Sequence, residues 1–280
     1  MRRPALFRPG IMVAWLVLVV LAVAFVAPLV FMLVGSLKPD ASVLVSAGSL
    51  KGFVPTGVSL DNYRDVFERV RFGRYLMNSA IITAFICAGG LIVNSMAGYA
   101  FARLRWPGRD AVFALVLAVM ILPLEAIAVP LFYQVSLLGL RDTYLVQILP
   151  FLANAFSIYL FYSFFAGLPR ELEEAAYMDG AGITGTFFRI IVPNSRPAFA
   201  SVAILTFLMQ WGAFLWPLMV TTSETVRPLP LAISTFYSLP PLAWGDIFAF
   251  GVMMVAPVLL VFLVFQRWFV RSVATTGVRG

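Results

Sequence analysis

The sequence predicts an all-α integral membrane protein with six transmembrane helices, and three observations support this prediction. Hydrophobic residues make up 61% of the 280 residues, and charged residues only 12%. Soluble domains carry about 25% charged residues. Six runs that are free or nearly free of charge each reach about 20 residues, the length that a helix needs to cross the hydrocarbon core. Backbone polar groups must be satisfied internally in that core, so such runs form helices.

The expected elements follow in order along the chain. A cytoplasmic N-terminus at 1–10 leads into a first span at 11–37, whose apolar run is too long for a signal peptide. An outer loop at 38–74 follows, and residues 60–75 show the spacing of an amphipathic helix that Asp61 would cap. The remaining elements are spans at 75–102, 111–133 and 143–167, a cytoplasmic loop at 168–196, spans at 197–222 and 247–267, and a cytoplasmic tail at 268–280.

The arrangement of basic residues predicts that both termini are cytoplasmic. Six spans place the termini on one side, and in this orientation the inner segments carry more Lys and Arg than the outer ones. One cluster in the outer loop weighs against it, namely Arg64, Arg69, Arg71 and Arg74. The net charge of +7 does not indicate nucleic acid binding, because the basic residues lie between apolar runs and form no contiguous face.

Several kinds of chemistry are excluded by residue counts. The chain has no histidine and one cysteine, Cys87, which rules out Ser-His-Asp and Cys-His catalysis, His-ligated metal sites and an internal disulfide. Its only lysines, Lys38 and Lys51, precede Pro and Gly, so neither belongs to a phosphate-binding P-loop. No cofactor or metal is therefore expected on this chain, and any ATP and Mg²⁺ would be bound by a partner.

The expected cytoplasmic loop contains a short acidic helix that is suited to docking. Pro169 ends the preceding span, and three glutamates at 171–174 favour a helix N-terminus, where the dipole is positive. A helix of about nine residues is not stable alone in water. Its residues at i, i+3, i+4 and i+7 spacing would leave a flat face for another protein: Leu172, Ala175, Ala176 and Asp179.

This segment resembles the EAA loop of bacterial ABC importer permeases. Glu174-Ala175-Ala176 is followed at the family's spacing by Gly180, Ile190, Val192 and Pro193, and only Val192 departs, standing in place of Leu. The longer pattern, Ala-Ala-x-x-Asp-Gly-Ala, is similar to the carbohydrate-uptake (MalG-like) branch. The resemblance implies an ATPase-docking set of Glu171, Leu172, Glu174, Ala175, Ala176, Asp179, Gly180, Gly182, Ile190 and Pro193.

Other parts of the chain resemble the same family. Asn78-Ser79, the segment 123–143, and the stretch 211–218 match its patterns, although Gly212 stands where the family usually has Asn. The tail at 277–280 also resembles the MalG-type ending. The implied fold is that of a MetI-like type I importer permease in the bacterial inner membrane. The implied partners are two ABC ATPase subunits, a second homologous permease and an outer solute-binding protein, and the implied cargo is a sugar, a polyol or a related solute such as glycerol phosphate.

Polar residues inside the expected spans are candidates for the substrate pathway. Glu125 is the only charge within such a span, and intramembrane charges favour a functional interpretation. The full candidate set is Glu125, Asn94, Asn154, Gln210 and Trp211. Hydrogen bonds between helices are the alternative role for the amides.

Two other functional classes fit the sequence less well. A secondary transporter that works alone would usually show an internal repeat and several ionisable residues near the midplane, and neither is evident. A membrane-embedded enzyme would need an acid–base pair or a metal set, which this composition does not supply.

Overall fold

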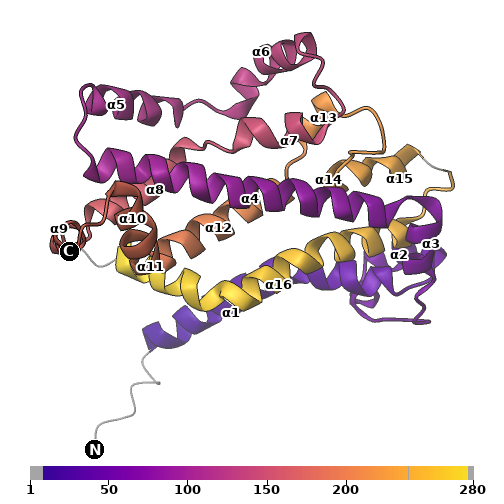
Figure 1. The fold of residues 1–280 in the computed structure, drawn as a ribbon. Coiled ribbons are helices and arrows are strands. Elements are labelled where there is room, and N and C mark those ends of the chain that lie inside the picture. The colour runs from indigo at the N-terminus through magenta and orange to yellow at the C-terminus, as the bar shows by residue number, and fades with distance from the viewer. Residues whose placement is uncertain (1–8, 239, 277–280) are drawn as a thin grey trace, which may run out of the picture. The chain divides into compact units, whose positions relative to one another are not determined.

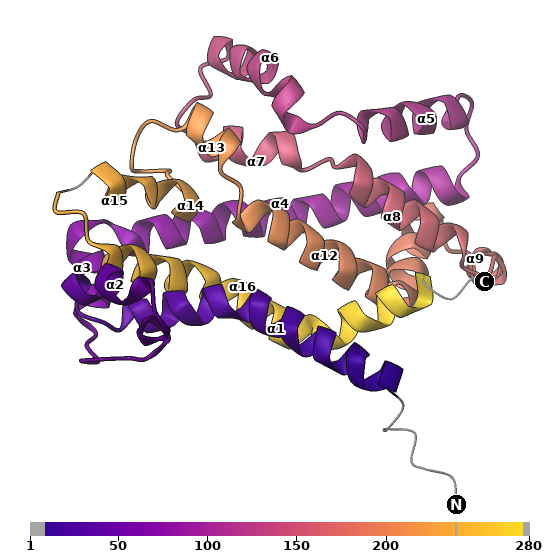
Figure 2. The same ribbon diagram turned by 180° about the vertical axis from the view of Figure 1, so that it is seen from behind.

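The computed structural model describes residues 9–238 and 240–276, and these residues form helices and no strand. The chain divides into two compact units. The first unit comprises Met1–Gly73 and Ile233–Ala256, and the second comprises Arg74–Ala232 and Pro257–Gly280. Figures 1 and 2 show the helices of both units from opposite sides.

The helices can be given in chain order. They are α1 (Pro9–Ser36), α2 (Asp40–Ala47), η2 (Leu50–Phe53), α3 (Asp61–Arg69), α4 (Phe72–Arg103), α5 (Arg109–Val119), α6 (Leu124–Leu137), α7 (Tyr144–Ile148), η3 (Leu149–Phe151), α8 (Ala155–Ala166), α9 (Glu171–Met178), α10 (Ile183–Thr186), η4 (Phe187–Ile191), α11 (Val192–Asn194), α12 (Arg196–Trp211), α13 (Leu215–Val220), α14 (Leu229–Ala232), α15 (Ser234–Ser238) and α16 (Trp244–Thr276).

Four segments are long and apolar enough to cross a membrane as they stand: Ile11–Ser36, Phe72–Arg103, Tyr144–Ala166 and Trp244–Phe265. Two further candidates are bent pairs, α5 with α6 at 101° and Ile183–Asn194 with α12 at 80°. Among the described residues the count therefore reaches six if each bent pair is one span. The all-helical prediction agrees with this architecture.

The expected third and fifth spans are not single straight helices. Residues 120–123 separate α5 from α6, where Pro123 has no backbone N–H to continue the ladder. The segment expected at 197–222 is helical to Trp211, opens at 212–214 and resumes as α13. Proline alone does not decide these breaks, because Pro28 and Pro257 lie inside the continuous helices α1 and α16.

In the first unit, α1 lies beside the first part of α16 (Figure 1). The rings of Phe31 and Phe248 meet edge to face with centroids 5.6 Å apart. Gly251 supplies the room for close packing, since a Cβ there would lie 2.8 Å from the sulfur of Met32. Such small-residue contacts are how helices approach each other in a membrane, where water supplies no hydrophobic force.

The segment that follows α1 in this unit is held by buried polar side chains. The Nζ of Lys38 is enclosed and donates to the carbonyl oxygens of Lys51 at 2.7 Å and Gly52 at 3.1 Å. Asn62 of α3 donates to the carbonyl oxygens of Ser36, the last residue of α1, and of Lys38, just beyond it. The loop is therefore fixed by side-chain bonds to orphaned carbonyls at the helix end.

The amphipathic helix expected at 60–75 is shorter than predicted and is capped differently. It spans Asp61–Arg69 as α3, and the chain is extended at Val70 before α4 begins. Asp61 is the first helical residue rather than the cap, and its backbone N–H bonds Ser59 Oγ at 2.9 Å. Val66 on this helix and Val70 just after it are buried, whereas Phe67 is exposed.

In the second unit, α8 lies beside α4 (Figures 1 and 2) and also packs against α12. The two backbones come closest at Gly98, where an added Cβ would lie 2.6 Å from Phe161 Cβ and 3.0 Å from the backbone nitrogen of Tyr162. Only glycine allows this approach without displacing α8. The crossing places the C-terminal end of α4 beside the end of α8.

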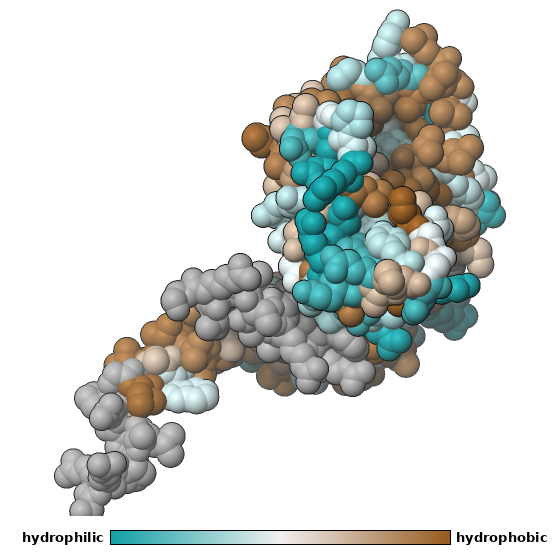
Figure 3. All heavy atoms as spheres, turned by 60° about the vertical axis from the view of Figure 1, so that its left-hand side comes forward, coloured by the Kyte–Doolittle hydropathy of each residue, from teal (hydrophilic) through white to brown (hydrophobic). Residues whose placement is uncertain are grey.

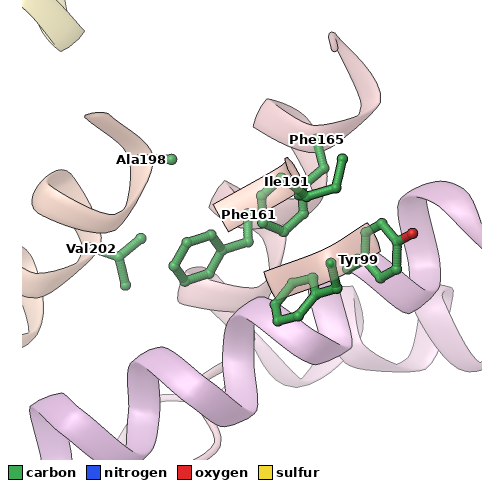
Figure 4. Close-up of a cluster of buried hydrophobic side chains, with 7 residues drawn as sticks. Tyr99, Phe161, Phe165, Ile191, Ala198 and Val202 are labelled. Carbon is green, nitrogen blue, oxygen red and sulfur yellow. The ribbon is translucent and has the colours of Figure 1, made fainter. Parts of the chain in front are cut away.

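A cluster of buried apolar side chains ties four helical elements of this unit together (Figure 4). Tyr99 comes from α4, Phe161 and Phe165 from α8, and Ile191 from the π-helical turn η4. Ala198 and Val202 of α12 close the cluster. The segment that follows α9 is thereby joined to three membrane helices.

At the opposite end of the same unit, Asp142 anchors the connection after α13. Asp142 has a positive φ of 58°, a conformation that Asp tolerates better than most residues. Its carboxylate accepts hydrogen bonds from the backbone N–H groups of Thr222 at 2.7 Å and Ser223 at 2.9 Å, and from both hydroxyls. Partial burial acts to raise the pKa of Asp142, but these hydrogen bonds outweigh it and hold the pKa below its usual value.

This anchor predicts a loss of stability in acid. Because the folded pKa is lowered, the stabilisation is present above the ordinary Asp value of about 3.9 and is lost as pH falls through the folded pKa. Asp142→Asn is expected to lower stability at pH 7 by about 1 kcal/mol and to remove this acid-dependent part. Melting of both proteins in detergent at pH 7 and near pH 3 checks it, and equal pH profiles would contradict it.

Candidate coupling loop and pathway residues

The predicted docking helix forms as α9, and its C-terminal end is a complete Schellman motif. The N–H of Ala181 bonds the carbonyl of Ala176 at 2.9 Å, and the N–H of Gly180 bonds that of Tyr177 at 3.0 Å. Gly180 has a φ of 80°, the left-handed conformation that glycine adopts without strain. Gly182, by contrast, has a φ of −78° and precedes α10, so its backbone has no special requirement for glycine.

The four residues expected to share one accessible face of α9 do not do so. Ala176 is buried, with 7% of its surface exposed, and Leu172 is half-buried. Ala175 and Asp179 are exposed, as are Glu171 and Glu174. The face open to a partner is therefore acidic at its start and passes through Ala175 to Met178, which is 88% exposed. Hydrophilic residues gather over the end of the unit that carries α9 (Figure 3).

The buried face of α9 carries a charged residue, Glu173. Its Oε1 accepts a hydrogen bond from the hydroxyl of Tyr99 at 2.9 Å. Its Oε2 lies 3.2 Å from Nε of Arg103, in an ion pair whose side chains are only 4% and 10% exposed. The Nη2 of Arg103 also donates to the carbonyl of Leu168 at 2.6 Å, just before α9 begins.

The remainder of the loop folds back on the apolar cluster. Residues 183–194 form α10, the π-helical turn η4 and α11 without interruption. Ile190 is half-buried and Pro193 is exposed at the second position of α11. Phe187 of η4 packs on Tyr99 with ring centroids 5.1 Å apart. The motif residues thus belong to one short segment, α9 to α11. This segment contacts α4 at Tyr99, through Glu173 and Phe187.

Three of the five predicted pathway residues come together. Asn94, Asn154 and Gln210 line one small cavity of about 20 Å³, with Phe151 and Met209 among its other walls. A volume of this size holds about one water molecule, whereas pockets for small-molecule ligands measure about 300–1,000 Å³. A larger open hollow of about 390 Å³ lies at the turn between α4 and α5 and contains none of the predicted residues.

The two asparagines already use much of their hydrogen-bonding capacity within the chain. Asn94 donates to the carbonyl of Leu152 at 3.1 Å and accepts from the N–H of Asn154 at 2.8 Å. The side chain of Asn154 caps α8 by accepting from the N–H of Ser157 at 2.9 Å. These bonds are the helix-to-helix role that the sequence left open as an alternative.

The other two pathway candidates lie outside this cavity. Glu125 is exposed in the first turn of α6, just after the break at 120–123, so it does not sit within a continuous span. Trp211 is buried at the end of α12 and stacks on Phe207 with centroids 5.4 Å apart. Neither is among the residues that line the cavity around Asn94.

Sequence reasoning did not assign a role to Glu173, Tyr99 or Arg103. In the sequence, Arg103 is one of several basic residues beside a span, and Glu173 is one of three acids at a helix N-terminus. One signal was available, because Tyr99 and Arg103 are four residues apart and share a face at the end of α4.

Within the described part of the chain, no group of three His, Cys, Asp or Glu residues is placed to hold a metal ion.

Comparison with known proteins identifies the family. Residues 90–275 match the family model of the binding-protein-dependent transport system inner membrane component. The chain is 35% identical to the arabinooligosaccharides transport system permease protein AraQ of Bacillus subtilis, over 93% of this chain and 92% of the relative. It is 33% identical to the diacetylchitobiose uptake system permease protein NgcG of Streptomyces coelicolor, over 98% and 88%. It is 34% identical to the sn-glycerol-3-phosphate transport system permease protein UgpE of Yersinia pestis, over 72% of each.

The fold agrees with this assignment. A crystal structure of a bacterial ABC transporter involved in the import of the acidic polysaccharide alginate contains a chain that superposes with a TM-score of 0.85. That likeness covers 96% of this chain and 99% of the other at 23% identity. The MetI-like fold and the family resemblance predicted from the motifs are both confirmed. The chain belongs to the binding-protein-dependent transport system inner membrane component family, and it is a membrane-embedded ABC transporter permease subunit rather than an enzyme.

Proposed function

We propose that this chain forms half of the translocation pathway of a bacterial importer for a sugar, a polyol or a related solute. The observation that carries the proposal is α9, a short acidic helix. One of its faces is exposed, and the other contacts the membrane helices. Relatives over nearly the whole chain are named as permeases for arabinooligosaccharides and diacetylchitobiose. Because the relatives also include a permease for sn-glycerol 3-phosphate, the solute class extends beyond neutral sugars.

In this proposal α9 and the segment after it dock on one of two cytoplasmic ABC ATPases. The ATPases bind the ATP and Mg²⁺, since this sequence contains no P-loop. The docking set is the one expected from the motif, with direct contact made by its exposed members Glu171, Glu174, Ala175 and Asp179. Closure of the ATPases would move α9 and switch the membrane helices between inward- and outward-facing states as rigid bodies.

The pathway requires a second homologous permease. The cavity around Asn94, Asn154 and Gln210 is too small for a sugar, so the proposed route lies along a face that a companion permease completes. An outer solute-binding protein would deliver the solute to the opposite end. Gln210 remains the pathway candidate with most freedom, because the Asn94 and Asn154 amides are engaged between helices.

We propose that both termini are cytoplasmic and that the chain lies in the bacterial inner membrane. The arginine cluster at 64–74 weighed against this orientation. Two of its members form ion pairs, Arg64 with Glu68 and Arg69 with Asp246, so they have a structural role in this segment. With Arg103 buried against α9, the basic residues of the inner segments still include those of the loop at 103–110.

The test is Ala175→Arg, which adds bulk and charge to the exposed docking face. We expect the ATPase and the second permease to co-purify with the tagged wild-type chain. We expect the variant to take up solute at least about tenfold more slowly, because α9 no longer fits its partner. Uptake is measured with labelled arabinotriose, diacetylchitobiose and sn-glycerol 3-phosphate, using whichever of these the wild-type complex transports.

The matched control is Ala111→Arg, the same change at an exposed position of α5 away from α9. It is expected to leave uptake within about twofold of wild type, since surface changes away from such contacts are mild. Full uptake by Ala175→Arg membranes would refute docking through this face. A chain that purifies alone and transports with an ion gradient would instead favour a secondary transporter.

A further inference from the structure

The buried contact between α9 and α4 has a role that the docking face does not explain. We propose that Glu173 is a positioning residue, which transmits movement of α9 to α4 through its contacts with Arg103 and Tyr99. These three residues are called the latch below. The inference rests on the proposed coupling to an ATPase, and it concerns the inner face of α9 rather than the face that the partner would touch.

The helix α9 has little stability of its own. It has eight residues, and such a helix is marginal in water. Its backbone packs against α10 and η4. Its contacts with α4 include those of Glu173 with Tyr99 and Arg103, and Tyr177 also interacts with the Tyr99 hydroxyl. The latch is the buried and charged part of this connection.

The energetics of the Glu173–Arg103 ion pair favour a positioning role over a stabilising one. The Glu173 and Arg103 side chains are 10% and 4% exposed, so both charges have lost most of their hydration. A buried pair of this kind often adds little net stability compared with apolar residues of the same size. It does restrict the position of α9 relative to α4. Hydrogen bonds and paired charges are lost when their atoms slide apart, whereas an apolar contact tolerates sliding. The latch is therefore better suited to transmitting position than to stabilising the fold.

The latch is attached at the end of α4, where several elements meet. Tyr99 and Arg103 occupy the last two turns of α4. The Tyr99 hydroxyl points away from the apolar cluster while its ring lies within it (Figure 4). Arg103 donates at the same time to the carbonyl of Leu168 at the start of the loop. One carboxylate on α9 is thus connected to α4, to the end of the α8 segment and to the apolar cluster that includes α12.

The experiment compares Glu173→Gln with wild type in the full complex, purified through the tagged permease and reconstituted in liposomes. ATP hydrolysis and import of the labelled solute found in the uptake panel are measured together. We expect Glu173→Gln to retain the ATPase and its hydrolysis, while import per ATP falls about tenfold, within the usual range of coupling between sites. A purely structural role would lower the yield of complex, hydrolysis and import in parallel, and that result would overturn the proposal.

The control is Asp110→Asn, the same carboxylate-to-amide change at an exposed acid that pairs with Arg109. It is expected to keep the wild-type ratio of import to hydrolysis. Exchange of the charges, Glu173→Arg with Arg103→Glu, is expected to recover part of the ratio. Replacement by an apolar pair, Glu173→Leu with Arg103→Met, is expected to retain the assembled complex and lose coupling.

Tyr99→Phe keeps the test decisive if charge changes prevent assembly, because it removes one hydroxyl and leaves the ring in its cluster. Import per ATP is expected to fall in this variant as well. A wild-type ratio in Tyr99→Phe and in Glu173→Gln would refute the latch while leaving the docking proposal intact. Absence of any ATPase from the wild-type preparation would refute the docking proposal itself, and the latch with it.

Discussion

Gly98→Val is expected to prevent the second unit from folding correctly. A Cβ at this position would lie 2.6 Å from Phe161 Cβ, 3.0 Å from Tyr162 N and 3.1 Å from Ile158 O. Two of these three atoms belong to the α8 backbone, so no side-chain rotation relieves the overlap. Overpacking costs about 1–3 kcal/mol where side chains can adjust, and we expect about 3 kcal/mol or more here. Yield and melting temperature in detergent measure the effect.

The same substitution at Gly73 provides the control on the same helix. Gly73 also lies within α4, and an added Cβ there meets no atom within 4 Å. Both changes replace a glycine of α4 by valine, so the difference between the two variants mainly reports the contact with α8. A Gly98→Val protein as stable as Gly73→Val would show that the two helices do not cross this closely in the native protein.

Asp246→Ala is expected to destabilise the first unit by about 3 kcal/mol, because it removes one partner of a buried ion pair. Asp246 is 2% exposed and pairs with Arg69 of α3. Arg69 also donates to the carbonyl of Pro241 at 2.7 Å and lies over the ring of Phe236. Loss of the carboxylate removes the acid that pairs with this guanidinium in a largely buried site. Thermal melting followed by tryptophan fluorescence measures the loss.

An exposed ion pair on the same helix gives the comparison. Glu68 pairs with Arg64 at 2.7 Å, and both side chains are more than half exposed. Solvent screens such a pair, so Glu68→Ala is expected to change stability by less than about 0.5 kcal/mol. Equal melting temperatures for Asp246→Ala and Glu68→Ala would contradict a buried role for Asp246. In the double variant Asp246→Leu with Arg69→Met, much of the loss is expected to be recovered.

These two sites show what an arginine in the segment between α1 and α4 does. Sequence reasoning counted Arg69 as evidence about membrane orientation, because a lone basic residue beside a span usually serves that purpose. Its partner, Asp246, lies 177 residues later in the chain. No spacing rule connects positions that far apart, so the pair was not predictable from a single sequence. The arginine instead fixes α3 to the start of α16.

The sequence by itself determined the class of the protein, the approximate positions of its apolar helices and the short acidic helix α9. These features depend on composition and on spacings of a few residues, which act locally on the backbone. The positive φ of Gly180 is the clearest example, because a helix C-terminus needs a residue that adopts this conformation cheaply. The family resemblance also rested on a local pattern, and the comparisons confirmed it.

Only the tertiary structure decided which residues face one another. It turned Ala176 inward and Ala175 outward, broke the expected third span at 120–123, and left Glu125 exposed beside that break. It also brought Glu173 to Tyr99, across 74 residues of sequence. Helical spacing defines faces but not what covers them, since burial depends on contacts between distant segments. For that reason the helix α9 was predictable from the sequence. Its buried contacts with Tyr99 and Arg103 required the fold.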